Sequence, residues 1–280
     1  MKKPLTGALC ALALAAPAAL VAAAPAAAAP APAPAAVAVN FAGTVALSNC
    51  SGSLVRMPNS VDSDPGLILT NGHCLETGMP AAGQVITNQT STRGFTLLNA
   101  SGGSLGTVKA NRVLYSTMTD TDVTLYRLSS SYATIKSRYG ISALTLDTAH
   151  PVAGSSIKVV SGYWKKIYSC SVDGFAYRLK EGSWTWKDSV RYTSGCDIIG
   201  GTSGSPVVDA TTGKVVAVNN TINEDSQTCT VNNPCEVDQN GTVTIRPGLG
   251  YAQETYTIPN CFAPGNVLDL TRAGCVLPRP

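Results

Sequence analysis

Charged residues are scarce in this chain of 280 residues: Asp, Glu, Lys and Arg together make up 13%, and the formal net charge is +3. Beyond the two lysines at 2–3, the only adjacent basic residues follow an aromatic side chain, in the stretch WKK at 164–166. Proteins that bind nucleic acids concentrate Lys and Arg on one surface to neutralise phosphates. The sequence therefore argues against a nucleic-acid partner.

Long stretches with helical periodicity are also rare. The chain instead carries many short runs of Val, Ile, Thr and Tyr, separated by Gly, Asn, Asp and Ser. This pattern is typical of strands joined by turns. The length allows one large domain or two smaller ones that share an interface. We predict an all-β protein.

Histidine is the scarcest chemically useful residue, because only His73 and His150 are present. The zinc motifs His-Glu-x-x-His and Cys-x-x-Cys are both absent, so no ligand set for metal-dependent hydrolysis is visible, and we expect no metal in the active site and no cofactor. Whether a metal ion stabilises a loop stays open. A proton shuttle near neutral pH would need one of these two imidazoles. His150 precedes a proline in a polar turn, and we assign it no role.

The amino terminus has the features of an export signal. Two lysines precede an apolar stretch at 5–24, and small residues continue to about residue 36. We predict that 1–36 form a secretory signal peptide with an Ala/Pro-rich linker, which makes the mature protein extracellular. Prolines at 17, 25 and 30, and the lack of basic residues after the apolar stretch, argue against a retained membrane anchor.

The cysteine count agrees with export. Of nine cysteines, Cys10 lies in the predicted signal, which leaves an even number in the mature region. We therefore predict four disulfides, formed in an oxidising compartment. The count alone leaves 105 possible pairings open. The simplest pairing joins nearest neighbours: Cys50 with Cys74, Cys170 with Cys196, Cys229 with Cys235, and Cys261 with Cys275.

A histidine and an aspartate stand at the ends of predicted strands. His73 follows an apolar strand and a turn in LILTNGHC. Asp122 is the first residue of DVTLYRL and directly precedes its apolar run. An imidazole acts as a general base through one nitrogen when a carboxylate holds the other. Asp122 is our candidate for that carboxylate, and Asp120 is the rival.

A serine lies between glycines in GGTSGSP, at 200–206. A serine nucleophile needs fixed donors for the oxyanion that its attack creates. We expect the amides of Gly201 and Ser203 to supply them, and Gly204 to allow the turn that exposes the hydroxyl. An α/β-hydrolase is excluded, because position 205 is not glycine and both histidines precede the serine.

The segments LTNGHC, DVTLYRL and GGTSGSPVVD resemble the active-site segments of secreted trypsin-like serine proteases of the chymotrypsin fold. GTSGSPV is most similar to the bacterial branch that includes the glutamyl endopeptidases. The resemblance implies two six-stranded antiparallel β-barrels, at 37–135 and 136–258, with the active site between them, followed by a disulfide-closed tail at 259–280. It also implies that the bond between Cys50 and Cys74 braces the histidine loop.

The same resemblance implies a serine endopeptidase with a catalytic triad of His73, Asp122 and Ser203 and an oxyanion hole of Gly201 and Ser203. We expect protein or peptide substrates, a monomer, and no membrane association after signal cleavage. Two alternatives stay open. One is a protease-like binding protein without catalysis, and the other is an esterase that uses the same triad.

Three positions bear on activation and substrate preference. Animal trypsins have an aspartate before the nucleophile, which pairs with a newly cut amino terminus, whereas this chain has Thr202, so we expect no activation at a basic cleavage site. Asp197 stands six residues before Ser203, where it either selects cationic substrate side chains or faces water. Asn219 occupies the position of a histidine in glutamyl endopeptidases, which makes a preference for glutamate less favoured.

Overall fold

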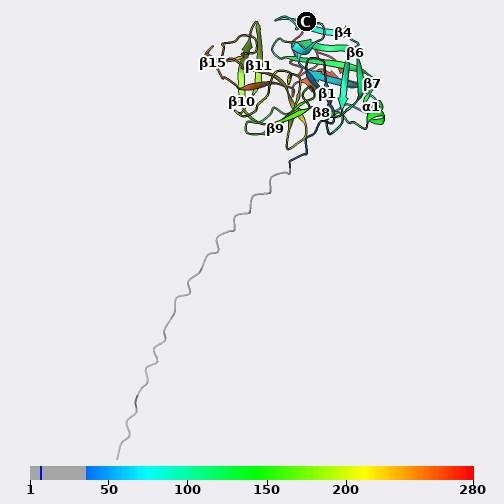
Figure 1. Ribbon diagram of the computed structural model, residues 1–280, viewed down its shortest axis with the longest axis horizontal. Coiled ribbons are helices and arrows are strands. Elements are labelled where there is room, and N and C mark those ends of the chain that lie inside the picture. The colour runs from blue at the N-terminus through cyan, green and yellow to red at the C-terminus, as the bar shows by residue number, and fades with distance from the viewer. Residues whose placement is uncertain (1–6, 8–35) are drawn as a thin grey trace, which may run out of the picture. The chain divides into compact units, whose positions relative to one another are not determined.

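The computed structural model describes residue 7 and residues 36–280 (Figure 1). Apart from residues 7 and 36, the predicted signal peptide and linker lie outside the described residues. In chain order the strands are β1 (Thr44–Ala46), β2 (Ser51–Arg56), β3 (Pro65–Thr70), β4 (Val85–Thr90), β5 (Gly94–Leu98), β6 (Ser104–Thr117), β7 (Val123–Ser131), β8 (Leu144–Thr145), β9 (Ser156–Ser161), β10 (Lys166–Glu181), β11 (Trp184–Tyr192), β12 (Pro206–Asp209), β13 (Val215–Ile222), β14 (Cys235–Val237), β15 (Val243–Ile245), β16 (Gly250–Glu254), β17 (Phe262–Ala263) and β18 (Val267–Leu268). The helical elements are α1 (Tyr132–Tyr139) and the short 3₁₀ turns η1 (Gly72–Cys74) and η2 (Ile258–Cys261).

The first barrel is a closed ring of antiparallel strands in the order β1-β5-β6-β7-β3-β2, because β2 pairs back onto β1. Strand β6 is long enough to pair with β4 as well. Side chains alternate along β7: Tyr126 and Leu128 face the interior of this barrel, whereas Val123 and Leu125 face a second apolar cluster. Because successive side chains point to opposite faces and both sets are apolar here, β7 is buried on both faces.

The second barrel closes in the same manner. Its ring runs β10-β11-β16-β13-β12-β9 and returns to β10. The hairpin of β14 and β15 extends the sheet from the edge of β10. The predicted all-β fold with two six-stranded barrels of the chymotrypsin type is confirmed.

The apolar cluster outside the first barrel joins the two barrels and the tail. It combines Leu125 of β7 with Val160 of β9 and Val208 of β12, and it includes Phe262 and Leu277. The tail thus packs against both barrels through apolar side chains. The predicted border between residues 135 and 136 falls inside α1, and the exact domain limits stay a prediction.

All four nearest-neighbour disulfides are present, as predicted: Cys50–Cys74, Cys170–Cys196, Cys229–Cys235 and Cys261–Cys275. The last of these bonds joins two cysteines that are 14 residues apart in the sequence, and it closes the tail into a loop. Within the described part of the chain, no helix has the length and apolar character needed to cross a membrane.

Candidate active site

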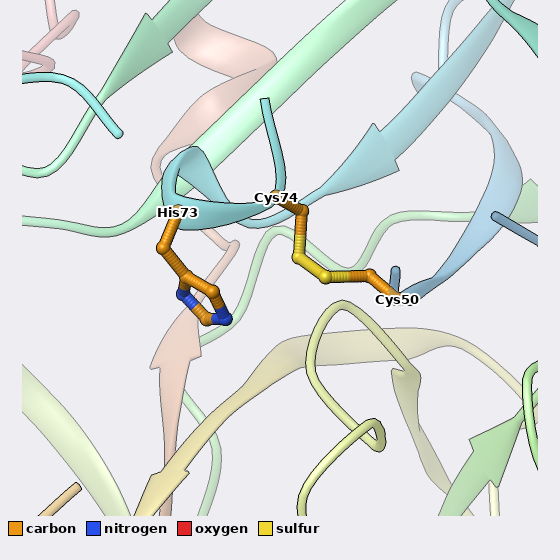
Figure 2. A group of neighbouring side chains, drawn as sticks. All are labelled: Cys50, His73 and Cys74. Atoms are coloured by element: carbon orange, nitrogen blue, oxygen red, sulfur yellow. A yellow bond between two sulfur atoms is a disulfide. The ribbon is translucent and has the colours of Figure 1, made fainter. Parts of the chain in front are cut away.

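His73 lies on η1, immediately after β3. The adjacent Cys74 forms a disulfide with Cys50, which directly precedes β2, and the two Cα atoms are 6.1 Å apart (Figure 2). The histidine turn is thereby tied to the strand beside it. This is the bracing that the family resemblance implies.

The imidazole of His73 is held by Asp122. Nδ1 of His73 lies 2.7 Å from Oδ2 of Asp122, and the backbone N–H of His73 donates to Oδ1 at 3.0 Å. The side chain of Asp122 has no exposed surface, and the Nδ2 group of Asn71 donates to its backbone oxygen at 2.9 Å. A buried carboxylate needs such partners. The contact fixes a proton on Nδ1 and leaves Nε2 as the acceptor of the neutral ring.

These contacts also change the proton affinity of the ring. Burial lowers the pKa of His73, but the charge of Asp122 and its hydrogen bond raise the pKa by more, and the net pKa lies above the ordinary 6.5. Asp120, the rival of Asp122, instead forms an ion pair with Lys187 at the surface. Only Asp122 contacts the histidine.

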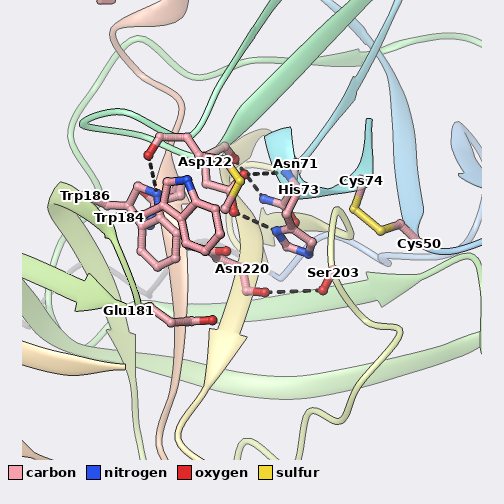
Figure 3. A network of polar contacts seen from close by, with 12 residues as sticks. Cys50, Asn71, His73, Cys74, Asp122, Glu181, Trp184, Trp186, Ser203 and Asn220 are labelled. Atoms are coloured by element: carbon pink, nitrogen blue, oxygen red, sulfur yellow. Dashed lines mark hydrogen bonds and ion pairs between the residues drawn. A yellow bond between two sulfur atoms is a disulfide. The ribbon is translucent and has the colours of Figure 1, made fainter. Parts of the chain in front are cut away.

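Ser203 lies in the loop before β12, on the side of the imidazole opposite Asp122 (Figure 3). Its hydroxyl donates to the backbone oxygen of Asn220 at 3.3 Å, and among the described residues it forms no hydrogen bond with His73. His73 and Ser203 line one cleft. Catalytic hydrogen bonds are often long or absent in ligand-free enzymes and form when the substrate binds.

Gly204 makes the position of this serine possible. Its φ is +76°, and an added Cβ would lie 2.1 Å from the backbone oxygen of Ser51. The backbone of Ser203 is anchored to the same strand, because the N–H of Ser51 donates to its carbonyl at 2.8 Å. The nucleophile loop therefore packs directly against the first barrel, as only glycine permits.

The amides of Gly201 and Ser203 are free. Within residues 36–280 neither N–H donates to a protein acceptor. Gly201 has a φ of +85°, and the carbonyl of the preceding Gly200 accepts a hydrogen bond of 2.8 Å from Nε1 of Trp164. Because the C=O and N–H of one peptide point in opposite directions, this bond turns the N–H of Gly201 away from Trp164. Free, fixed amides of this kind can bind an anion.

Asn219 is buried under the nucleophile loop. Its Nδ2 group donates to the hydroxyl of Thr202 at 3.0 Å, and its Oδ1 accepts from the hydroxyl of Tyr192 at 2.9 Å. The Thr202 hydroxyl in turn donates to the carbonyl of Ile199 at 2.6 Å. These bonds hold the loop where animal trypsins use a buried amino terminus. Both ends of the Asn219 amide are occupied, so it supports the loop and offers little to a substrate.

Asp197 does not reach the cleft. It is exposed, whereas the cleft is lined by the neighbouring Ile198, Ile199 and Gly200. Of the two interpretations of Asp197, the structure therefore agrees with an aspartate that faces water. Selection of a cationic side chain by Asp197 has no support in the geometry.

Sequence reasoning missed Glu181, the last residue of β10. Its side chain lines the cleft that holds His73 and Ser203 and is only 7% exposed (Figure 3). Oε1 accepts from the backbone N–H of Asn232 at 2.9 Å, and Oε2 has no partner in the described part of the chain. Burial raises the pKa of this carboxyl. Nothing local in the sequence marks Glu181, because the strand end and the cleft meet only in three dimensions.

A double barrel with a buried His–Asp pair beside a serine loop is the arrangement typical of peptidases of the chymotrypsin fold. In agreement, the family model of the trypsin-like peptidase domain matches residues 50–218. The chain belongs to this family.

Two solved structures are similar to the chain at low identity. The Rv3671c protease of M. tuberculosis, in its inactive form, is 13% identical, with a TM-score of 0.47 over 77% of this chain and 85% of that one. The protease domain of MamO from Magnetospirillum magneticum, in the apo form, is 14% identical, with a TM-score of 0.47 over 78% and 94%. A search of curated proteins found no match.

Proposed function

We propose that this protein is a secreted serine endopeptidase in which Ser203 is the nucleophile and His73 the general base. The observation that carries the proposal is the contact of His73 with the buried Asp122, which presents Nε2 toward the serine side of the cleft. Four disulfides are typical of proteins that mature in an oxidising compartment. Secretion is part of the proposal.

The reaction begins when His73 Nε2 takes the hydroxyl proton of Ser203 as its Oγ attacks a peptide carbonyl. The oxyanion that forms accepts hydrogen bonds from the amides of Gly201 and Ser203. The imidazolium, stabilised by Asp122, then gives its proton to the leaving amine, and an acyl-enzyme remains. Water attacks the ester by the same route in reverse and regenerates the serine.

The substrates in this proposal are proteins or peptides, and the enzyme acts as a monomer without a membrane anchor. Similarity to the glutamyl-endopeptidase branch does not extend to a preference for glutamate. The position of the branch's histidine holds Asn219, whose side-chain nitrogen and oxygen each form one hydrogen bond, with Thr202 and Tyr192. Among the residues that the structure describes, no lysine or arginine lines the cleft to receive a carboxylate.

One observation favours the alternative of a protease-like binding protein without catalysis, because the Ser203 hydroxyl is bonded to the carbonyl of Asn220. Labelling with an organophosphonate separates the two. We expect one equivalent of label per folded chain, and none in Ser203→Ala. Folded wild-type protein that takes up no label would establish the binding module instead. Comparing peptide and ester substrates of the same sequence separates the endopeptidase from the esterase.

A further inference from the structure

A second cluster of titratable side chains lies outside the cleft, around His150. Nε2 of His150 is 3.1 Å from Oε1 of Glu254, at the end of β16, and 3.2 Å from Oδ2 of Asp188 in β11. The three residues come from distant parts of the chain, and one ligand atom of each lies within 4.8 Å of the other two. None of them lines the cleft of His73 and Ser203.

Glu254 is the unusual member. Its side chain is 5% exposed, and apart from the 3.1 Å contact of Oε1 with His150, neither carboxylate oxygen has a hydrogen-bond partner in the described part of the chain. Its neighbours are a second carboxylate, Asp188, and the imidazole of His150. A buried, ionised carboxylate that faces another carboxylate is unfavourable, and burial together with Asp188 raises the pKa of Glu254 to about 10. At neutral pH the pair therefore holds either a shared proton or a cation in its place.

The orientation of His150 shows where that cation would bind. Nδ1 lies 2.7 Å from the backbone oxygen of Pro151, so Nδ1 carries a proton and donates it. With Nδ1 committed to this carbonyl, Nε2 is the ring nitrogen that faces the two carboxylates and that would offer its lone pair to an ion between them. A metal-bound histidine typically has this arrangement, with one nitrogen held by a carbonyl and the other free to ligate.

Aromatic rings hold this imidazole from two sides. Phe175 and Tyr256 pack edge-on against it, with ring centroids at 4.5 and 5.1 Å. The Tyr256 hydroxyl donates to Oδ2 of Asp188 at 3.3 Å. An open cavity lined by Asp188, Glu254 and Tyr256 gives access from solvent. Both the ring and one carboxylate are therefore oriented before any ion binds.

We propose that His150, Asp188 and Glu254 form a binding site for a divalent transition-metal ion of the zinc class. Zinc accepts one nitrogen and two carboxylate oxygens at about 2.0–2.2 Å, and adjacent ligands of such a tetrahedron are about 3.3–3.5 Å apart. The separations of 3.1 and 3.2 Å between Nε2 and the two oxygens are close to that spacing. Imidazole favours zinc over calcium or magnesium, which prefer oxygen ligands alone.

The site would cross-link the second barrel, since it joins β11, β16 and the turn before β9. Water or a group from the adjoining cavity would complete the coordination. The proposal is independent of the proposed peptidase activity, because its ligands lie outside the cleft.

The chain offers a matched control, because it contains only two histidines. Metal-free protein would be prepared with a chelator and titrated with Zn²⁺ by calorimetry, and with Co²⁺ by visible absorption. We expect the wild type and His73→Ala each to bind one equivalent of Zn²⁺. His150→Ala and Glu254→Gln should bind it at least tenfold more weakly. A hundredfold excess of Zn²⁺ over Kd should raise Tm by about 5 °C in the first two proteins only.

Circular dichroism establishes that each variant is folded, and Asp188→Asn serves as a third ligand variant if one of the others unfolds. The proposal is overturned if folded wild type binds no stoichiometric Zn²⁺, or if His150→Ala binds it as well as the wild type. An NMR titration of the His150 ring signals with Zn²⁺ tests the competing explanation, in which no metal binds. If His150 is a stable imidazolium between the two carboxylates, its ring signals stay protonated at neutral pH and do not respond to Zn²⁺, and the metal site is wrong.

Discussion

Nε1 of Trp164 donates a hydrogen bond of 2.8 Å to the carbonyl oxygen of Gly200, and this bond sets the orientation of the peptide between Gly200 and Gly201. An added Cβ at Gly201 would lie 2.9 Å from the same indole nitrogen, so glycine and indole fit each other closely. If this peptide turned over, the N–H of Gly201 would leave the proposed oxyanion hole. Trp164 is thus a positioning residue for that amide.

The first prediction follows from this bond. Trp164→Phe keeps an aromatic ring but removes the N–H donor, and we expect kcat to fall about tenfold with little change in KM. Loss of a whole oxyanion donor costs about 10²–10³ in kcat, and loss of its support should cost less. Tyr163→Phe, in the neighbouring exposed ring, is the control and should stay near wild type. A tenfold rise in KM with unchanged kcat would contradict the role of Trp164 as a positioning residue.

The second prediction concerns pH. Only the neutral imidazole of His73 can accept the proton of Ser203, and the pKa of His73 lies above 6.5 because the effects of Asp122 outweigh that of burial. We expect kcat/KM to be lost as pH falls through this raised pKa. Asp122→Asn removes both effects of Asp122 and leaves burial opposed only by the charge of Glu181, so the midpoint should move to lower pH while kcat drops about 10⁴-fold. Steady-state profiles of kcat/KM between pH 5 and pH 9 for the wild type and Asp122→Asn test both expectations. An unmoved midpoint in the variant would refute the assignment of this titration to His73.

The third prediction assigns a role in specificity to Glu181. Its Oε2 has no protein partner and lies in the cleft, where a substrate cation could pair with it. We expect Glu181→Gln to lower kcat/KM about tenfold for peptides that place Lys or Arg beside this residue, with neutral peptides little affected. Because burial raises the pKa of Glu181, the preference should strengthen as pH rises.

A peptide library with each position varied in turn measures this preference. Asp197→Asn is the matched control, because it removes a carboxylate that is exposed outside the cleft. A uniform loss across all peptides in Glu181→Gln would indicate a structural role alone.

The fourth prediction tests the close contact at Gly204. Gly204→Ala would place a methyl group 2.1 Å from the Ser51 carbonyl at a φ of +76°. Gly195 has a φ of +99° with no atom within 4 Å of an added Cβ, so Gly195→Ala measures the backbone cost alone. We expect Gly195→Ala to lower the free energy of unfolding by about 1–3 kcal/mol, and Gly204→Ala to lower it further and abolish activity. Equal melting temperatures for the two variants would show that the loop can move away from Ser51.

Much of the candidate site could be predicted from local sequence. His73 and Asp122 stand at strand ends, and Ser203 lies in a glycine loop, so each carries its own signal. The cysteines pair with their nearest neighbours, at separations of 6 to 26 residues, and the simplest assumption was therefore sufficient. Short runs of Val, Ile, Thr and Tyr separated by turn residues were likewise enough to predict an all-β fold.

The tertiary structure alone decided the rest. Trp164 forms a hydrogen bond with Gly200, 36 residues further along the chain. Glu181 shares the cleft with His73 only because β10 ends there. Asp197 is exposed, although its spacing from Ser203 suggested a role in substrate selection. His150 had no assigned role until barrel closure brought β11 and β16 to its turn. Local sequence determines the backbone pattern and the chemistry that each residue carries. Which of those residues meet depends on how two closed barrels pack, and that is set by many apolar contacts distributed along the whole chain.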